Sequence, residues 1–429
     1  MTLVNHVAAL IILAWIIGGL IIRSRRPSIP IWAIMAAAST LTVLAGLEPF
    51  DKLGEAIDLD VILFLIGMFS LVGLAEGSGL LKVIAIKLVS RAGSTRGILV
   101  STSIVLGLLA AFAVNDTVAL MGPPIVYTMA KITGVDPVPF FLILAFAITI
   151  GSAMTPMGNP QNLLIAIESG ITAPFMKFMI VLIAPTLVNL VLTPLIVMKL
   201  YNIENRVLKG IIIIPEEHLK NKRDALVSAV FFTATIVILV VNDILEIMGF
   251  KWIEHRGFIP FMMASLAYIL SSNPRDTLSR VDWGTIVFFI TMFITMDGIW
   301  RSGVLNPLLN IFMSARYGDY RDVLSIMASS IVISQLISNV PFTKLFIDYM
   351  HSLGFTGGDV NAWLSLAAFS TIAGNLTLLG AASNIIILEV LESKYSKTIS
   401  FKDFFKVGSM VTAVNTLIYL PFILAFSPF

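Results

Sequence analysis

Two short polar stretches stand inside otherwise apolar runs of this chain, and their residue types indicate ion or substrate binding. The run "AFAVNDTVALMGPPIV" holds Asn115, Asp116 and Thr117, and a second apolar run holds Ser338 and Asn339. A carboxylate surrounded by apolar residues is costly, and such a group can exchange H+ for Na+ or couple either ion to a substrate. Asp116 has a simpler alternative role as a helix N-cap, because a carboxylate accepts backbone amide protons.

The composition identifies the surroundings of these residues as a membrane. Of the 429 residues, 57% are apolar and only 13% are charged, and uncharged apolar runs recur along the whole chain. This pattern is typical of an integral membrane protein in contact with the lipid bilayer. The net charge of +2 gives no indication of a nucleic-acid partner, and the lack of cysteine excludes thiolate metal sites. The four histidines are not spaced as metal ligands, so an H-E-x-x-H metalloprotease is excluded.

An internal repeat organises the chain. Residues 57–81 and 281–305, related by an offset of 224, are identical at nine of 25 positions, and the same offset places Asn115 on Asn339. Further along, "TPMGNPQNLLIA" (155–166) matches "TLLGAASNIIIL" (377–388) at an offset of 222. The sequence therefore predicts two copies of one unit.

The distribution of basic residues predicts how the copies cross the membrane, because Lys and Arg concentrate in cytoplasmic loops. We expect 97–130 and 322–353 to be re-entrant hairpins and 82–96 to lie along the interface, which places 20 of the 28 basic residues on one side. Five passes per copy is an odd number, so the copies are expected to have opposite orientations, with both termini outside. The ten expected passes are 7–22, 31–47, 61–77, 138–168, 175–198, 224–246, 257–272, 284–300, 363–390 and 405–427.

The predicted fold class is therefore an all-α polytopic membrane protein with two inverted repeats. Repeat 1 spans 1–200 and repeat 2 spans 224–429, joined by a cytoplasmic linker at 201–223. Each repeat holds one hairpin and one broken helix, which are 138–168 and 363–390. Irregular backbone at membrane depth is tolerated only where protein or a wet cavity surrounds it. Two hairpin tips facing two helix breaks therefore predict one pseudo-symmetric binding site near the midplane.

These four motifs resemble the ion transporter superfamily. The hairpin tips "VNDT" and "ISNVP" and the breaks "TPMGNPQNL" and "LLGAASNII" occur in the order expected of that superfamily, and the resemblance covers nearly the whole chain. The superfamily holds arsenite-efflux permeases, D-type sodium/proton antiporters, citrate transporters and sodium-coupled dicarboxylate symporters. The resemblance implies a scaffold domain, an elevator-type transport domain and a homodimer. The "ND" tip is closer to the arsenite permeases than to the Ser-Asn-Thr tip of the dicarboxylate branch.

The residues expected to bind substrate or ion follow from the tips, the breaks and the resemblance. They are Asn115, Asp116, Thr117, Thr155, Gly158, Asn159, Asn162, Ser338, Asn339, Lys344, Thr377, Gly380, Ser383 and Asn384. If the coupling ion is Na+, we expect it near Asn115, Asp116, Gly158 and Asn162. Asn162 and Asn384 have the alternative role of ordinary helix-start residues.

Three further charged positions carry open interpretations. Lys344 replaces one bound cation of the pseudo-symmetric pair, or it forms an i,i+4 ion pair with Asp348. Asp297 lies in the middle of an apolar run and has no obvious partner in the sequence. Glu168 and Glu389 close the two broken helices and are expected to act as interfacial anchors rather than ligands.

The expected function is secondary active transport in the cell membrane, with no catalytic residues and no resident cofactor. The expected substrate is a small anion or an arsenite-like metalloid oxyanion, coupled to H+ or Na+. The alternatives are a sodium/proton antiporter, a sodium-coupled dicarboxylate symporter and, from a different class, an ion channel. No paired-aspartate, Ser/His or metal constellation indicates an enzyme. No P-loop occurs, so any drive by ATP would come from a separate ATPase subunit.

Overall fold

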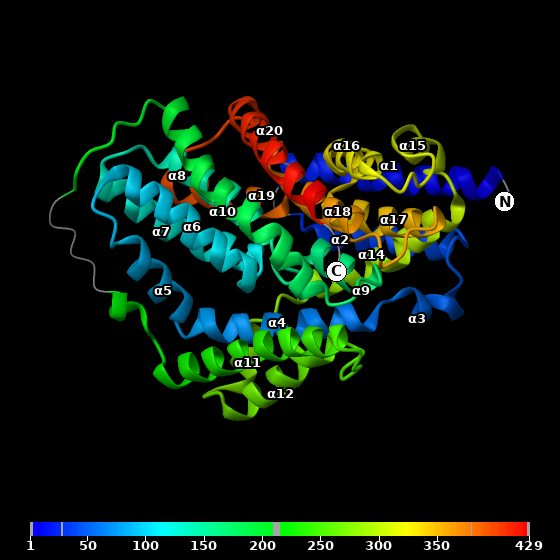
Figure 1. The fold of residues 1–429 in the computed structure, drawn as a ribbon, viewed down its shortest axis with the longest axis horizontal. Coiled ribbons are helices and arrows are strands. Elements are labelled where there is room, and N and C mark those ends of the chain that lie inside the picture. Colours follow the sequence, from blue (N-terminus) through cyan, green and yellow to red (C-terminus); the bar gives the residue numbers. More distant parts are fainter. Residues whose placement is uncertain (1–2, 27–28, 209–214, 379, 427–429) are drawn as a thin grey trace.

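The computed structural model describes residues 3–26, 29–208, 215–378 and 380–426, and these contain helices and no β-strand (Figure 1). The first half holds α1 (Leu3–Arg25), α2 (Ile31–Leu44), η1 (Phe50–Lys52), α3 (Leu53–Ala56), α4 (Leu59–Gly77), α5 (Leu80–Val89), α6 (Thr95–Ala113), α7 (Asn115–Thr133), α8 (Pro137–Ser152), α9 (Pro160–Glu168) and α10 (Pro174–Leu200). The second half holds η2 (Pro215–His218), α11 (Lys222–Ile247), α12 (Phe258–Leu270), α13 (Pro274–Ser279), α14 (Trp283–Ser302), α15 (Asn306–Phe312), α16 (Tyr320–Ile337), α17 (Asn339–Ser352), α18 (Val360–Ile372), η3 (Ala373–Asn375), α19 (Ala382–Tyr395) and α20 (Phe401–Ala425).

Many of these helices have the length and composition of membrane spans. Within the described residues, eight helices are long and apolar enough to cross a bilayer, and α2, α8 and α12 are shorter apolar helices. On α1, large apolar side chains such as Leu10 and Ile11 are more than half exposed. A soluble protein would not expose such a row, so this face is suited to contact with lipid.

The two halves present the same order of elements. In the first half a long helix (α4) is followed by a short helix, a helix pair (α6 and α7), an interrupted helix (α8 and α9) and a long helix (α10). The second half repeats this order with α14, α15, α16 and α17, α18 and α19, and α20. The order matches the repeat read from the sequence. The opposite orientation of the two copies and the boundaries of the repeats stay predictions.

The expected segments agree with the observed helices at most positions. Each expected hairpin is a pair of contacting helices, and each expected broken helix is interrupted, between Ser152 and Pro160 in one half and between Asn375 and Ala382 in the other. The expected pass 31–47 ends at Leu44, and part of the expected interfacial segment 82–96 is the helix α5. Within the expected linker, residues 209–214 lie outside the described residues.

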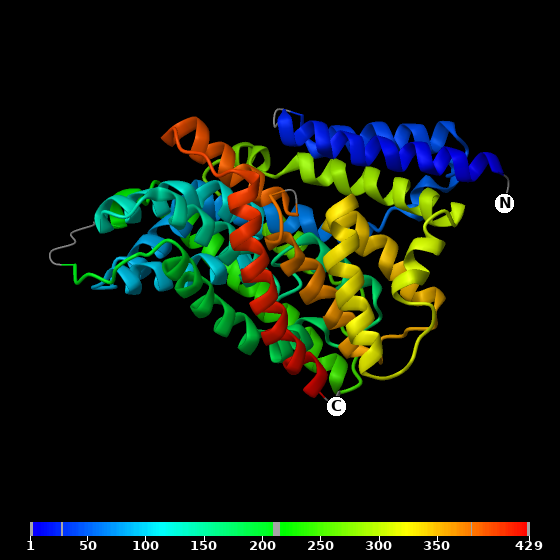
Figure 2. The same ribbon diagram turned by 90° about the horizontal axis from the view of Figure 1, so that it is seen from above.

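Two groups of helices flank the hairpins and broken helices. The helices α1, α2 and α14 lie side by side along one edge of the molecule (Figure 2). The helices α4, α11 and α12 form the second group, at the bottom of Figure 1. In each group a helix from one half packs against a helix from the other, so neither half has a separate core.

Glycines allow the closest helix packing in the core. The helix α8 is buried over almost its whole length and packs against α6. A Cβ atom added at Gly151 would lie 2.0 Å from the carbonyl oxygen of Gly107. Small residues at such crossings allow backbones to approach, which is how helices associate in membranes without a hydrophobic driving force.

We therefore expect Gly151→Ala to destabilise the protein by about 1–3 kcal/mol or more, because the new methyl group meets backbone that cannot rotate away. The measurement is the melting temperature of the purified protein in detergent. Gly18→Ala is the matched control, because a Cβ at Gly18 of α1 has no atom within 4 Å. Equal melting temperatures for the two variants would contradict the close packing of α6 on α8.

Candidate functional site

The two hairpin tips share an uncommon backbone conformation. Val114, between α6 and α7, has φ of 64°, and Ser338, between α16 and α17, has φ of 73°. The two positions are equivalent in the repeat. Positive φ is rare for residues other than glycine, and especially for β-branched valine. Backbone held in such a conformation is often found at functional sites, and here it recurs at both tips.

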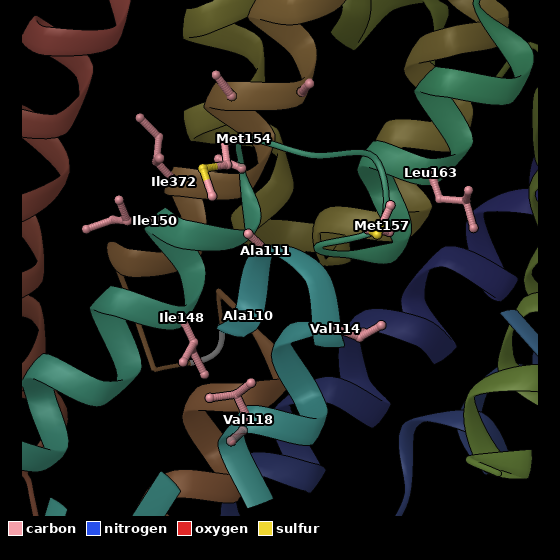
Figure 3. Close-up of a cluster of buried hydrophobic side chains, with 14 of the residues drawn as sticks. Ala110, Ala111, Val114, Val118, Ile148, Ile150, Met154, Met157, Leu163 and Ile372 are labelled. Carbon is pink, nitrogen blue, oxygen red and sulfur yellow. The ribbon is translucent and has the colours of Figure 1, made fainter. Parts of the chain in front are cut away.

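The first tip is held against the break of the neighbouring helix. The backbone amide of Asn115 donates to the carbonyl of Gly158 over 3.0 Å, and the Thr155 hydroxyl donates to the carbonyl of Ala111. Apolar side chains gather around the same place, including Met154 and Met157 of the break (Figure 3). This packing places the polar tip and the irregular turn at the same depth in the molecule.

A cavity of about 280 Å³ lies where the two tips and the two breaks meet. The tips contribute Asn115, Asp116, Ser338 and Asn339, and the breaks contribute Pro160, Gln161, Gly380, Ala381 and Ala382. The remaining walls come from the end of α1, the start of α2 and the start of α14. The prediction that both tips face both breaks in one site is therefore supported by the geometry of a single cavity.

Four of the helices that begin at this cavity belong to the tips and breaks. The first residues of α7, α9, α17 and α19 are Asn115, Pro160, Asn339 and Ala382, and all four line it. The helices α7, α17 and α19 have no side-chain N-cap, whereas Asn159 caps α9. Helix N-termini carry partial positive charge and unpaired amide protons. Their convergence makes the cavity suited to an anion or to ligand oxygen atoms.

Unpaired side-chain oxygens stand at both tips. Asn115 and Asn339 are 9% and 5% exposed, and the Oδ1 atom of each is buried without a hydrogen-bond partner. A buried amide oxygen without a donor costs free energy unless a ligand fills its place. Since these two residues are equivalent in the repeat and both line the cavity, the orphaned oxygens indicate a ligand between the tips.

Three charged side chains line the cavity. Asp116 lies in the first turn of α7, and its charge is attracted by Arg23 and repelled by Asp282. Asp282 is the N-cap of α14, and its Oδ1 accepts the Thr285 amide proton over 3.0 Å. Asp116 belongs to the same wall as the uncapped helix ends, so a cation held by it lies beside the predicted anion site.

Asn162 and Asn384 hold the two breaks together with matching hydrogen bonds. The Nδ2 of Asn162 donates to the carbonyls of Ser152 and Thr155, each over 3.2 Å. The Nδ2 of Asn384 donates to the carbonyls of Gly374 and Thr377, over 2.8 and 3.2 Å. Both side chains are fully buried, and neither lines the cavity. Their hydrogen bonds fix the conformation of the irregular turns, so these residues do not simply start a helix.

The predicted site residues thus divide into three groups. Those that line the cavity are Asn115, Asp116, Ser338, Asn339 and Gly380. Those that form hydrogen bonds with the backbone of the tips and breaks are Thr155, Gly158, Asn159, Asn162, Thr377 and Asn384. The Thr377 hydroxyl also donates to the side chain of Gln335 over 2.9 Å. Thr117, Ser383 and Lys344 do not line the cavity, although Ser383 follows the lining residue Ala382 and its hydroxyl is unpaired.

The predicted sodium position is only partly open to a ligand. Gly158 already accepts the Asn115 amide proton, and the Asn162 amide is occupied by break carbonyls and by Thr371. The oxygens left to bind a cation are those of Asn115 and Asp116. Within the described residues, no cluster of three or more His, Asp or Glu side chains suits a metal ion.

Lys344 contacts carboxylates and not the cavity. Its Nζ lies 2.7 Å from Glu168 Oε2 and 3.1 Å from Asp348 Oδ1. The pair with Asp348 is the helical pair considered from the sequence. Glu168 belongs to the broken helix of the other half, so this glutamate is a partner in an ion pair and not only an interfacial anchor.

Asp297 has two neighbours that the sequence analysis did not assign to it, although Arg301 stands four residues further along the same helix. Arg301 Nη2 lies 2.8 Å from Asp297 Oδ2, and Arg301 Nε lies 3.4 Å from Glu48 Oε2. Glu48 follows α2, and its side chain is fully buried. One arginine thus serves two carboxylates. Burial, together with the neighbouring Asp297 carboxyl, raises the pKa of Glu48 to about 7.

This pKa predicts a pH dependence of stability. Between about pH 4.3, the ordinary pKa of glutamate, and pH 7, folded Glu48 keeps a proton that the unfolded chain has lost, so the contribution of Glu48 to stability falls as the pH rises. Glu48→Gln removes this loss. We expect the stability of the variant relative to the native protein to rise by about 3 kcal/mol from pH 4.5 to pH 8. Melting temperatures at the two pH values measure it.

Glu55→Gln, at an exposed glutamate of α3, is the control for this measurement. A difference between Glu48→Gln and the native protein that stays the same at both pH values would contradict the protonation of Glu48 in the folded state.

Sequence reasoning missed several residues of the cavity, chiefly Arg23, Gln161, Asp282 and Thr285. Gln161 lies within the quoted break motif and could have been included from its position alone. Asp282 is equivalent to Asp58 in the repeat, and both are helix N-caps. Arg23 stands in a short basic run, and no local pattern distinguishes it from Arg25 and Arg26.

Comparison with known proteins places this chain among membrane transporters. A family model described as a citrate transporter matches residues 8–373. An uncharacterized transporter of Mycobacterium tuberculosis is 27% identical over 391 residues, covering 89% of each chain. The silicon efflux transporter LSI3 of Oryza sativa is 26% identical and covers 92% of this chain and 94% of its own.

Among solved structures, the YdaH transporter of Alcanivorax borkumensis superimposes with a TM-score of 0.59 at 14% identity, over 87% of both chains. This likeness shows a shared multi-pass helical fold. The resemblance to the ion transporter superfamily is confirmed, and so is the expectation that the protein is not an enzyme, because the family and its relatives are transporters. The chain belongs to the citrate transporter family of membrane transporters.

Proposed function

We propose that this protein moves a small anion by alternating access and couples the movement to H+ or Na+ at Asp116. The observation that carries the proposal is the convergence of four helix N-termini on one cavity that also holds the orphaned oxygens of Asn115 and Asn339. The helix ends supply partial positive charge and amide donors for the anion. The carboxylate of Asp116, in the first turn of α7, takes the coupling cation beside it.

The size and chemistry of the cavity favour a small oxygen-rich substrate. A volume of about 280 Å³ is just below the range of roughly 300–1,000 Å³ typical of small-molecule pockets. Metalloid oxyanions such as arsenite and small carboxylates such as citrate both present several oxygens to amide donors. The family is named for citrate and the rice relative for silicon. We rank the arsenite-like oxyanion first because of the Asn-Asp tip, and a carboxylate moved with sodium second.

The mode of movement is part of the same proposal. We propose two inverted repeats, a transport domain that moves like an elevator, a homodimer in the plasma membrane, both termini outside and the 199–223 loop in the cytoplasm. Support comes from the repeated order of elements and from the basic residues that the proposed topology gathers on one side.

A sodium/proton antiporter is the second candidate. The observation that favours it is that Asn115 and Asp116 of the first tip offer oxygens for a small cation. The uncapped helix ends and Arg23 place positive charge around the same cavity, which disfavours a site for cations alone. An anion carrier therefore accounts for more of the lining than an antiporter does.

Thermal stabilisation of the purified protein tests the proposal. The panel is Na+, Li+, arsenite, phosphate, sulfate, citrate and succinate, each at two pH values. A ligand present at about 100 times its Kd stabilises the folded state by about 2.7 kcal/mol. An anion shift that depends on Na+ or pH supports the anion carrier. A shift from Na+ or Li+ without any anion shift would favour the antiporter and contradict the proposal.

A further inference from the structure

Arg23 brings a full positive charge to the cavity. It lies in the last turn of α1, and α1 packs against α2 and α14 (Figure 2). Its Nε atom is buried and has no hydrogen-bond partner in the described part of the chain. A guanidinium has five N–H donors and no acceptor, so an unpaired buried Nε is free to donate to a ligand oxygen.

The carboxylates that act on Arg23 leave it available to a ligand. The negative charges that attract it most are those of Asp116, at the first hairpin tip, and Glu389, which is exposed on α19. Asp116 stands among the uncapped helix ends, where the proposed function places the coupling cation. When a cation or proton neutralises Asp116, Arg23 loses one of the two carboxylates that attract it most, and a bound anion can take the place of that negative charge.

Asp282 carries the opposite charge in the same lining. Its two carboxylate oxygens accept the amide and the hydroxyl of Thr285, over 3.0 and 2.6 Å, so it is occupied as the N-cap of α14. It therefore repels an anion in the cavity without offering a donor to it. Arg23 and Asp282 form a pair of opposite charges whose separate removal should change anion affinity in opposite directions.

We propose that Arg23 binds the negatively charged group of the substrate and so makes the cavity select anions over uncharged oxyacids such as silicic acid. This inference rests on the proposed function. The helix N-termini do not make this selection as strongly, because backbone amides also donate to neutral oxygens. The attraction of a full charge grows with the charge of the ligand. Arg23 thus narrows the substrate to a carboxylate or to the ionised form of an oxyacid. For arsenite this means the anion and not the uncharged arsenous acid that predominates at neutral pH.

The test compares probes of different charge in variants of the purified full-length protein. The probes are citrate, which carries several negative charges at pH 7.5, phosphate, and silicic acid, which is uncharged at that pH. The Kd of each is measured by titration at constant low ionic strength. Arg23→Gln should raise the Kd of citrate by about 10- to 100-fold, as expected for the loss of a charge-assisted hydrogen bond. The Kd of phosphate should rise less, and that of silicic acid should rise by less than about threefold.

Two further variants separate binding from a structural role. Arg23→Lys keeps the charge without the planar fork, so it should recover part of the citrate affinity. Asp282→Asn keeps a residue that caps helices and removes the repulsion between the carboxylate and a bound anion. It should therefore lower the Kd of citrate severalfold and leave the Kd of silicic acid unchanged. If Arg23→Gln does not fold, these two variants still decide the matter.

Equal weakening of charged and uncharged probes in Arg23→Gln would show a structural role and overturn the inference. Unchanged citrate affinity in Arg23→Gln, with citrate bound by the native protein, would overturn the inference and leave the proposed function standing. If the native protein binds none of the probes and no other anion of the panel, the inference and the proposed function both fail.

Discussion

Asp116→Asn is expected to abolish ion-driven accumulation of substrate while leaving the protein folded. The amide resembles the protonated carboxyl in size and keeps a neutral charge, so the site no longer alternates between a free and a bound coupling ion. A 100-fold gradient of the coupling ion corresponds to about 2.8 kcal/mol and supports roughly 100-fold accumulation at one-to-one coupling. In the variant we expect a ratio of internal to external substrate of about one, measured as uptake into proteoliposomes.

Exchange of labelled for unlabelled substrate provides the internal control. The cavity and its helix ends stay in place in Asp116→Asn, so counterflow without any ion gradient should persist. Asp136→Asn is the matched variant, because Asp136 forms an ion pair with Lys397 in which both side chains are half exposed. It should accumulate substrate like the native protein. Full gradient-driven accumulation by Asp116→Asn would exclude Asp116 as the coupling site, and absence of counterflow in the native protein would favour a channel.

Lys344→Met is expected to have the largest effect on stability. Lys344, Glu168 and Asp348 are 13%, 13% and 20% exposed, and the lysine is bound to both carboxylates. Its removal leaves two negative charges without their partner in a largely apolar setting. Breaking a buried ion pair from one side typically costs about 3–5 kcal/mol. We expect a correspondingly large fall in the melting temperature in detergent.

The triple variant with Lys344→Met, Glu168→Gln and Asp348→Asn should recover most of the lost stability, because no unpaired charge is left. Lys397→Met is the control for a surface pair, where the loss is about 0–1 kcal/mol. A similar small loss for Lys344→Met and Lys397→Met would contradict the burial of the triad. Because Lys344 lies away from the cavity, transport by the folded fraction should keep its ion dependence. A change in that dependence would restore the interpretation of Lys344 as a substitute for a bound cation.

The sequence alone determined the class of the protein and the position of its site along the chain. Hydrocarbon cannot satisfy free backbone groups, so Asn115-Asp116-Thr117 and the run around Gly158 stand out against their apolar neighbours wherever the chain later folds. The repeat offset then identified Asn339 and Asn384 as their equivalents. These signals are local in the chain, so the sequence alone contains them.

Only the tertiary structure decided which of these residues face the cavity and which hold the backbone around it. Asn162 and Asn384 donate to carbonyls of the breaks, whereas Asn115 and Asn339 line the cavity, and the residue type alone does not reveal this difference. Arg23 reaches the site because the end of α1 packs beside the start of α14, more than 250 positions later in the chain. Such contacts depend on how closely helices pack, as at Gly107 and Gly151. Contacts between distant segments produce no periodic pattern in the sequence.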